Sequence, residues 1–338
     1  MAFTAMGDHT VVNYCFQTLN NSCTKDIRAQ GEYIILYILL FLISASTVFL
    51  NLLVVIAVSH FKQLHTPTNL LLLSLAVADL LVGFLVMPVE GMRLIERCWY
   101  FGDTFCYIFP LILFVVISAS LGNLVFISVD RYIAVSNALN YYSYITLNKA
   151  VLCIFFSWFG SFVYSVLILS NHLLQPEPHR TCHGECLLVI NFSWIIADLF
   201  VSFTVPCSIV ICLYLKIFSM AKHQTLAINS VRNPGMTTNE NVKIRKSVNK
   251  AARTLGILVA VYLLCWIPYY VSILANGSIS SSSFIVTFLS WTMYMNSCMN
   301  PLIYALFYPW FRVSIKRILT LGILDPTSPY YSVYPDDV

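Results

Sequence analysis

Long apolar stretches alternate with short polar segments along this chain. Seven of these stretches have about the 20 residues, or more, that an α-helix needs to cross the hydrocarbon core of a membrane. Charges, prolines and polar clusters fill the gaps and are typical of loops. The period-two alternation of a membrane β-barrel is absent. The stretches are Tyr33–His60, Thr68–Met87, Cys106–Val135, Ala150–Ser170, Leu187–Ala221, Val248–Ala275 and Phe284–Leu306.

The composition supports a membrane protein. Of the 338 residues 59% are hydrophobic and only 10% are charged, whereas a soluble domain has about 25% charged residues. We therefore predict an all-α membrane protein: an N-terminal tail over residues 1–32, a seven-helix bundle over 33–306, an amphipathic helix over 307–321 and a flexible tail over 322–338. Basic Arg312 and Lys316 alternate with apolar Phe311 and Ile315 in the amphipathic segment.

The distribution of basic residues predicts the topology. With the N-terminus outside, 14 of the 19 lysines and arginines face the cytoplasm, as the positive-inside rule requires. The first thirty residues contain no basic segment followed by an apolar one, so we expect no cleaved signal peptide and expect the first helix to act as signal anchor. Three Asn-x-Ser sequons fit this orientation, and Asn20, in the free tail, is the best glycan acceptor among Asn20, Asn191 and Asn276.

Six of the eleven cysteines lie in the predicted outer segments, where disulfides persist. We expect Cys106 to pair with Cys186 and so to tie the top of the third helix to the second outer loop. Zinc binding by Cys182, His183 and Cys186 is the alternative. The five cysteines within helices are expected to pack as small apolar residues; they are Cys153, Cys207, Cys212, Cys265 and Cys298.

Polar residues and prolines recur near the middle of the predicted helices, where a polar group is costly. An Asp-Arg-Tyr triplet lies at the inner end of the third stretch. The set, in order along the chain, resembles the rhodopsin-like receptor superfamily. It comprises Asn51, Asp79, Asp130, Arg131, Tyr132, Trp158, Pro206, Pro268, Asn300 and Pro301.

A closer resemblance lies in the seventh helix. Residues 296–311 read N-S-C-M-N-P-L-I-Y-A-L-F-Y-P-W-F and match every fixed position of N-S-x-x-N-P-x-x-Y-x-x-x-Y-x-W-F, the fingerprint of the trace amine-associated receptors. Residues 59–69 and 98–102 are also similar to that family. The resemblance implies a second disulfide, between Cys23 in the outer tail and Cys182 in the second outer loop.

The resemblance also implies a switch mechanism. Pro268 permits a kink in the sixth helix, and a ligand that touches Trp266, Tyr269 or Tyr270 would bias that bend; an aromatic core stripe is the alternative. Arg131 is expected to pair with Asp130 until a G protein binds. Tyr214 and Tyr304 resemble the tyrosines that move inward on activation.

Asp79, with Asn51 and Asn300, resembles the buried sodium-ion site of the superfamily; a purely structural polar network is the alternative. We expect no other cofactor.

One departure from the amine-receptor pattern affects the ligand site. Counting from Cys106 and from Asp130 puts Leu113 where aminergic receptors hold the ligand ammonium with an aspartate. Asp198, in an apolar run of the fifth helix, is the proposed replacement, and Ser202 shares its face. The alternative is a protonated Asp198 hydrogen-bonded to Tyr or Ser.

Two further residues complete the predicted ligand site. Glu90 near the outer end of the second helix is a candidate second cation contact, which would admit diamines, or a solvated residue. Tyr294 is expected in the pocket floor.

The predicted function is that of an amine receptor at the plasma membrane, not an enzyme. The family implies a small amine ligand and a stimulatory or olfactory G protein that raises cyclic AMP; membrane lipids are the other expected partner, and nucleic acid is not. A transporter of small cations would show inverted repeats and interrupted helices, which we do not find. A receptor for a non-amine ligand remains a second alternative. A light receptor would need a lysine in the seventh helix, and residues 284–306 contain none.

Overall fold

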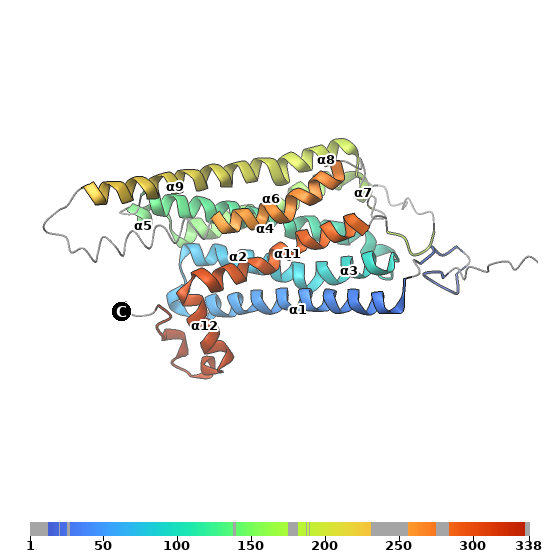
Figure 1. Cartoon of the computed structure of the whole chain (residues 1–338), viewed down its shortest axis with the longest axis horizontal. Helices are drawn as coiled ribbons and strands as arrows, with labels where there is room; N and C mark the ends of the chain where they lie inside the picture. The colour runs from blue at the N-terminus through green and yellow to red at the C-terminus, as the bar shows by residue number, and fades with distance from the viewer. Residues whose placement is uncertain are drawn as a thin grey trace, which may run out of the picture.

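The computed structural model describes residues 13–19, 21–25, 28–137, 140–174, 182–186, 188, 190–230, 256–274 and 284–334. Over these residues the chain is helical, and its only β-structure is two isolated bridges. The long helices run side by side in one bundle (Figure 1). They are α1 (Gln30–His60), α2 (Pro67–Leu81), η2 (Val82–Val86), α3 (Met87–Glu96), α4 (Asp103–Ser136), α6 (Leu147–Ile168), α8 (Phe192–Asp198), η4 (Leu199–Thr204), α9 (Val205–Ser230), the helix Gly256–Leu274 and α11 (Phe284–Phe307).

Six helical spans in the described residues are long and apolar enough to cross a membrane, with mean hydropathies from 2.1 to 2.6. The helix α11, of 24 residues, packs against α1 and α2. Together they make the expected seven-helix bundle, so the predicted fold class is confirmed. Large apolar side chains on α6 remain exposed, among them Phe155 and Phe159, as suits a lipid-facing surface.

Two helices differ in length from the sequence expectation. The second helix continues beyond Met87 as α3 and ends only where Arg97 takes a left-handed conformation, with φ 55°. Its π-helical segment η2 lies just before Pro88, and such segments accommodate an interruption without ending a helix. The fifth helix begins at Phe192 instead of Leu187 and ends at Ser230 instead of Ala221. Residues 248–255 of the expected sixth helix lie outside the described residues.

Local signals explain where several helices begin. The Thr66 side chain accepts a 3.3 Å hydrogen bond from the backbone N–H of Asn69 and caps α2, which has Pro67 in its first turn. Thr146 caps α6 in the same way, through the N–H of Lys149. The helix α4 lies at the centre of the bundle and packs against α2, α6 and α9.

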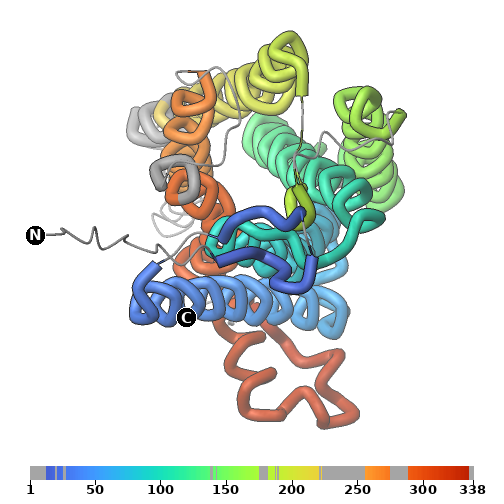
Figure 2. The backbone as a smooth tube through the Cα atoms, turned by 90° about the vertical axis from the view of Figure 1, so that its right-hand side faces the viewer, coloured from blue at the N-terminus to red at the C-terminus, as the bar shows by residue number. Residues whose placement is uncertain are grey.

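Three disulfides hold one end of the bundle, which we call the cap end. It carries residues 13–19, 21–25 and 182–186, which lie side by side across the bundle (Figure 2). The structure contains both expected pairs, Cys106–Cys186 and Cys23–Cys182, and a third pair, Cys15–Cys98, that the sequence did not suggest.

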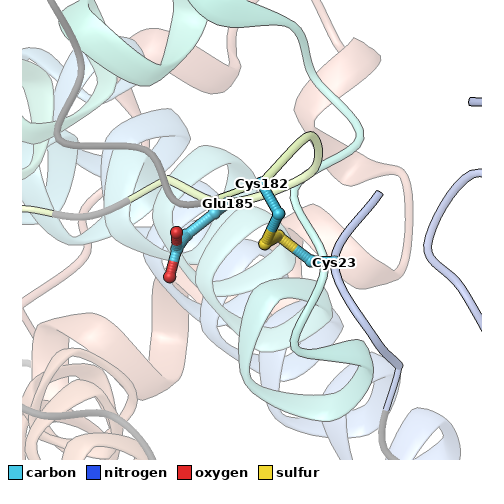
Figure 3. A group of neighbouring side chains, drawn as sticks. All are labelled: Cys23, Cys182 and Glu185. Atoms are coloured by element: carbon cyan, nitrogen blue, oxygen red, sulfur yellow. A yellow bond between two sulfur atoms is a disulfide. The ribbon is translucent and has the colours of Figure 1, made fainter. Parts of the chain in front are cut away.

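Disulfide bonding excludes the zinc alternative. Figure 3 shows the Cys23–Cys182 bond with the Glu185 carboxylate beside it. Cys182 and Cys186 are both oxidised, so neither thiolate remains for the proposed cluster with His183. Asn20, the expected glycan acceptor, lies outside the described residues.

Hydrogen bonds and one ion pair also hold the cap end. The backbone N–H of Cys23 donates to the His183 carbonyl at 2.8 Å. Lys25 forms an ion pair with Glu96 at the end of α3, and that contact raises the pKa of the Lys25 ammonium above its ordinary value. The N-terminal segment is therefore attached to the second helix as well as to the loop of residues 182–186.

The opposite end carries α12 (Pro309–Leu319), which turns away from the bundle (Figure 1). Its apolar face buries Trp310 and Phe311, within the segment expected to be amphipathic. The following residues differ from the expected flexible tail: they form the short helices η5 (Gly322–Leu324) and η6 (Ser328–Tyr330). Val333 is fully buried there, and its N–H donates to Gln63 at 3.1 Å.

Candidate ligand-binding site

A cavity of about 70 Å³ opens between α4, the η4 region, the helix Gly256–Leu274 and α11. Seven of the eight residues expected at the ligand site line it. They are accompanied by apolar side chains from α4 and α11. The lining consists of Leu113, Phe114, Ile117, Ser118, Leu121, Asp198, Ser202, Trp266, Tyr269, Tyr270, Met293 and Tyr294.

Asp198 accepts hydrogen bonds from two tyrosines. The Tyr164 hydroxyl donates to one carboxylate oxygen at 2.6 Å, and the Tyr270 hydroxyl donates to the other at 3.2 Å. Ser202 in turn donates to the Tyr164 hydroxyl at 3.2 Å. Within the described part of the chain, no lysine or arginine forms an ion pair with Asp198. The carboxylate therefore has the acceptor geometry of an anion and has no cationic protein partner there.

The local backbone brings Asp198 and Ser202 to the same cavity. Asp198 is the last residue of α8, and the π-helical segment η4 follows directly. The Thr204 side-chain hydroxyl donates to the Leu199 carbonyl at 3.0 Å within this segment. A π-helical turn widens the helix and changes the direction of the side chains that follow, and such segments are frequent at functional sites.

The α4 wall of the cavity is apolar. Leu113 lies in that wall, so the position of the usual amine-binding aspartate carries a hydrocarbon side chain. Ile117 and Leu121 continue the wall along α4. Among the described residues of the lining, Asp198 is the single carboxylate, so a cation that binds beside them has one anionic partner.

Aromatic rings form the floor. Trp266 stacks on Tyr270 with 5.9 Å between ring centroids and on Tyr262 with 5.4 Å. Tyr269 meets the edge of Trp266 at 6.5 Å. The π-face of such a ring attracts a cation within about 6 Å of its centroid. The cavity thus combines one carboxylate with rings that suit the body of an organic cation.

Glu90 does not line this cavity. It lies on α3, and the Arg93 side chain donates to its Oε2 from Nη2 at 2.7 Å and from Nε at 3.1 Å. The sequence alone allowed two interpretations of Glu90, a solvated residue or a second cation contact. It is buried and already has a cationic partner.

A second polar cluster lies deeper in the bundle, around the fully buried Asp79. Asn300 donates to one of its carboxylate oxygens at 2.7 Å and Ser120 donates to the other at 3.1 Å. Asn51 bonds instead to the carbonyls of Thr47 and Ser297. A small cavity of about 20 Å³ next to Ser120 and Ser297 separates this cluster from Trp266. The oxygen atoms of the cluster around Asp79 are suitable ligands for a hard cation such as sodium.

The Asp-Arg-Tyr triplet lies near the α12 end. Asp130 accepts hydrogen bonds from Arg131 at 2.6 Å, from Thr68 at 2.7 Å and from Tyr141 at 2.8 Å. Arg131 also contacts the Thr68 hydroxyl. The expected Asp130–Arg131 pair is therefore present, and α2 and α5 (Tyr141–Tyr144) help to hold it.

The two expected switch tyrosines lie near the same end. Tyr214 belongs to a cluster with Tyr132 and Ile217, and a side chain at Gly256 would meet its hydroxyl at 2.7 Å. Tyr304, three residues after Pro301, is almost completely buried against Phe311. Its hydroxyl has no hydrogen-bond partner among the described residues.

Sequence analysis did not identify two residues near the site, Tyr164 and Arg93. Tyr164 is a tyrosine in a predicted helix with no motif around it, and nothing local indicates its bond to Asp198. Arg93 follows Glu90 by three residues, which is the spacing of a helical ion pair, but the predicted apolar stretch ended at Met87 and put Glu90 only near the helix end.

Comparison with known proteins shows which family the chain belongs to. Residues 50–304 match the family model described as 7 transmembrane receptor (rhodopsin family). Trace amine-associated receptor 13c of Danio rerio is 39% identical over 93% of this chain and 94% of its own length. Trace amine-associated receptor 7e of Rattus norvegicus is 40% identical over 95% of the chain and 92% of its length. Trace amine-associated receptor 6 of Pan troglodytes is 38% identical over 97% of each.

The fold and these similarities define a rhodopsin-like, or class A, G-protein-coupled receptor, a membrane receptor and not an enzyme. Within that class, the chain belongs to the trace amine-associated receptors. The resemblance seen in the seventh helix is therefore confirmed over most of the chain.

Proposed function

We propose that this receptor binds a small amine, with the ligand ammonium held by Asp198. The single observation that carries the proposal is a carboxylate in the cavity wall that only accepts hydrogen bonds and has no basic partner among the described residues. Asp198 is partly buried, and a carboxylate withdrawn from water is stabilised by an opposite charge, which an ammonium ligand supplies. The names of the similar receptors support an amine as the ligand class.

The apolar wall at Leu113 supports a binding mode different from that of an aspartate in α4. An ammonium at Asp198 lies beside Tyr270 and Ser202, and the ligand body extends toward Trp266 and Leu113. Contact with Trp266 biases the bend of the helix at Pro268, which links occupancy to the conformation of the bundle.

Signalling is proposed to proceed through a stimulatory or olfactory G protein at the α12 end, with a rise in cyclic AMP. The Asp130–Arg131 pair is the contact that G-protein binding would open. The excess of lysine and arginine at this end supports a cytoplasmic position, and the three disulfides support an extracellular cap end at the plasma membrane. We assign sodium to the oxygen cluster around Asp79.

The test is a dose–response series for mono-, di- and polyamines on wild type and on Asp198→Asn, with surface expression matched by an N-terminal epitope tag. Losing one member of a buried charge pair costs about 2–5 kcal/mol, so potency should fall roughly 25-fold or more at 1.4 kcal/mol per tenfold. Ser118→Ala, in the same cavity lining, is the control and should respond like wild type. If Asp198→Asn responds like wild type to every active amine, the site is wrong.

A further inference from the structure

A second carboxylate lies close to the ligand cavity but is already paired. Glu90 on α3 is buried, with 8% of its side chain exposed, and Arg93 is 27% exposed. Both Arg93 donors, Nη2 and Nε, converge on the same oxygen of Glu90. The two residues follow each other by three positions on one helix, so the pair needs no other element to form.

The pair lies behind a wall of the cavity. Tyr269 and Tyr294 line the cavity, and both interact electrostatically with Glu90 and Arg93. Tyr294 also lines a smaller pocket with Met87 and Gly91 of α3. The helices α3 and α8, which carry Glu90 and Asp198, lie on different sides of the bundle (Figure 1).

Two carboxylates in these positions would suit a ligand with an ammonium at each end. Arg93 removes that possibility, because its guanidinium already pairs with the Glu90 carboxylate and cancels its charge. We infer that Arg93 is a specificity-determining residue that makes this receptor select monoamines over diamines. The inference rests on the proposed function, since it assumes that the first ammonium binds Asp198.

The rest of the cavity fits this inference. Beyond Asp198 the lining offers hydrocarbon and aromatic surface, with Leu113, Phe114 and Met293 among its members. An unpaired second ammonium against such surface would lose its hydration without gaining a partner. The expected ligand is therefore an apolar molecule with a single cationic group at one end.

The experiment uses three matched ligands: 4-methylbenzylamine, its para-bis(aminomethyl) analogue and 4-(aminomethyl)benzoate, with the corresponding six-carbon alkyl series alongside. Binding is measured as thermal stabilisation of the full-length receptor in lipid nanodiscs, which does not depend on G-protein coupling. In wild type the monoamine should bind at least about tenfold more tightly than the diamine, because the second ammonium of the diamine would lose its hydration without gaining an anionic partner.

Removing the guanidinium should reverse this preference. Arg93→Gln frees the Glu90 carboxylate, so the ratio of diamine to monoamine affinity should rise at least about tenfold. Arg93→Lys keeps the cation and should keep the wild-type ratio. The double variant Arg93→Gln with Glu90→Gln should lose the gain, which separates the charge from altered packing.

Glu90→Gln is the second, independent variant, and it leaves no carboxylate unpaired if Arg93→Gln fails to fold. It exposes the Arg93 charge, so the aminobenzoate should gain affinity and the diamine should lose it. An unchanged ligand ratio in both single variants, or a wild type that prefers the diamine, overturns the inference. Monoamine binding that is also insensitive to Asp198→Asn overturns the proposed function itself.

Discussion

The Tyr164 hydroxyl donates a 2.6 Å hydrogen bond to the Asp198 carboxylate, although Tyr164 belongs to α6 and does not line the cavity. A tyrosine on a neighbouring helix thus positions the residue that we propose to bind the ligand. Ser202 extends this network by donating to the same tyrosine oxygen.

Tyr164→Phe should weaken amine potency by about tenfold, because a hydrogen bond to a charged group contributes about 1.5–3 kcal/mol and the carboxylate loses its fixed orientation. The measurement is potency in the dose–response assay at matched surface expression. Ser202→Ala keeps the Tyr164–Asp198 bond and should cost less. Equal potencies for Tyr164→Phe and wild type would show that Tyr164 does not position Asp198.

The Cys15–Cys98 bond spans 83 residues and fixes the N-terminal segment to the turn before α4. The double variant Cys15→Ser, Cys98→Ser should lower the thermal stability of the receptor, since removing a disulfide from a small domain typically costs about 2–5 kcal/mol. Thermal unfolding and surface expression measure the effect. Cys212→Ser, at a free and exposed cysteine, is the control. A double variant as stable as the control contradicts a structural role for this bond.

The seven helices followed from the sequence because hydropathy acts locally and a membrane requires complete helices. The length of the second helix could not be predicted from the sequence in the same way. Pro88 normally ends a helix, but the π-helical segment before it lets the helix continue to Glu96. That boundary placed Glu90 near a helix end and Arg93 in a loop, so their pairing was not recognised.

Long-range partners were also beyond prediction. Tyr164 meets Asp198 only because α6 and α8 come together in space, and the spacing of residues along one helix contains no information about a second helix. The candidates Asp198, Trp266 and Tyr294 could be predicted because a polar or aromatic residue in an apolar run requires an explanation by itself.

The tail after α12 docks through Val333, which is fully buried, and through Tyr330, whose ring lies 4.1 Å from the Lys62 ammonium. Val333→Asp should release residues 322–334, because full burial of a valine contributes about 1.5–3 kcal/mol and a buried unpaired carboxylate is costly. Faster amide hydrogen exchange over these residues is the expected result. Tyr334→Asp, at an exposed position, is the control, and equal exchange rates in the two variants would contradict docking through Val333.

Arg131 binds Asp130 through two nitrogens, and Thr68 and Tyr141 hold the same carboxylate. None of these residues lines the ligand cavity. Arg131→Ala should therefore leave amine affinity within about threefold of wild type, since distant sites change nearly independently, and should abolish the cyclic-AMP response because the G protein loses its contact. Ligand-induced thermal stabilisation reports affinity, and cyclic AMP reports signalling. Arg312→Ala, on the exposed face of α12, is the matched control for the loss of an arginine at the α12 end. A normal cyclic-AMP response in Arg131→Ala would show that signalling does not depend on the Asp130–Arg131 pair. A loss of amine affinity in the same variant would show that this pair couples the two ends of the bundle.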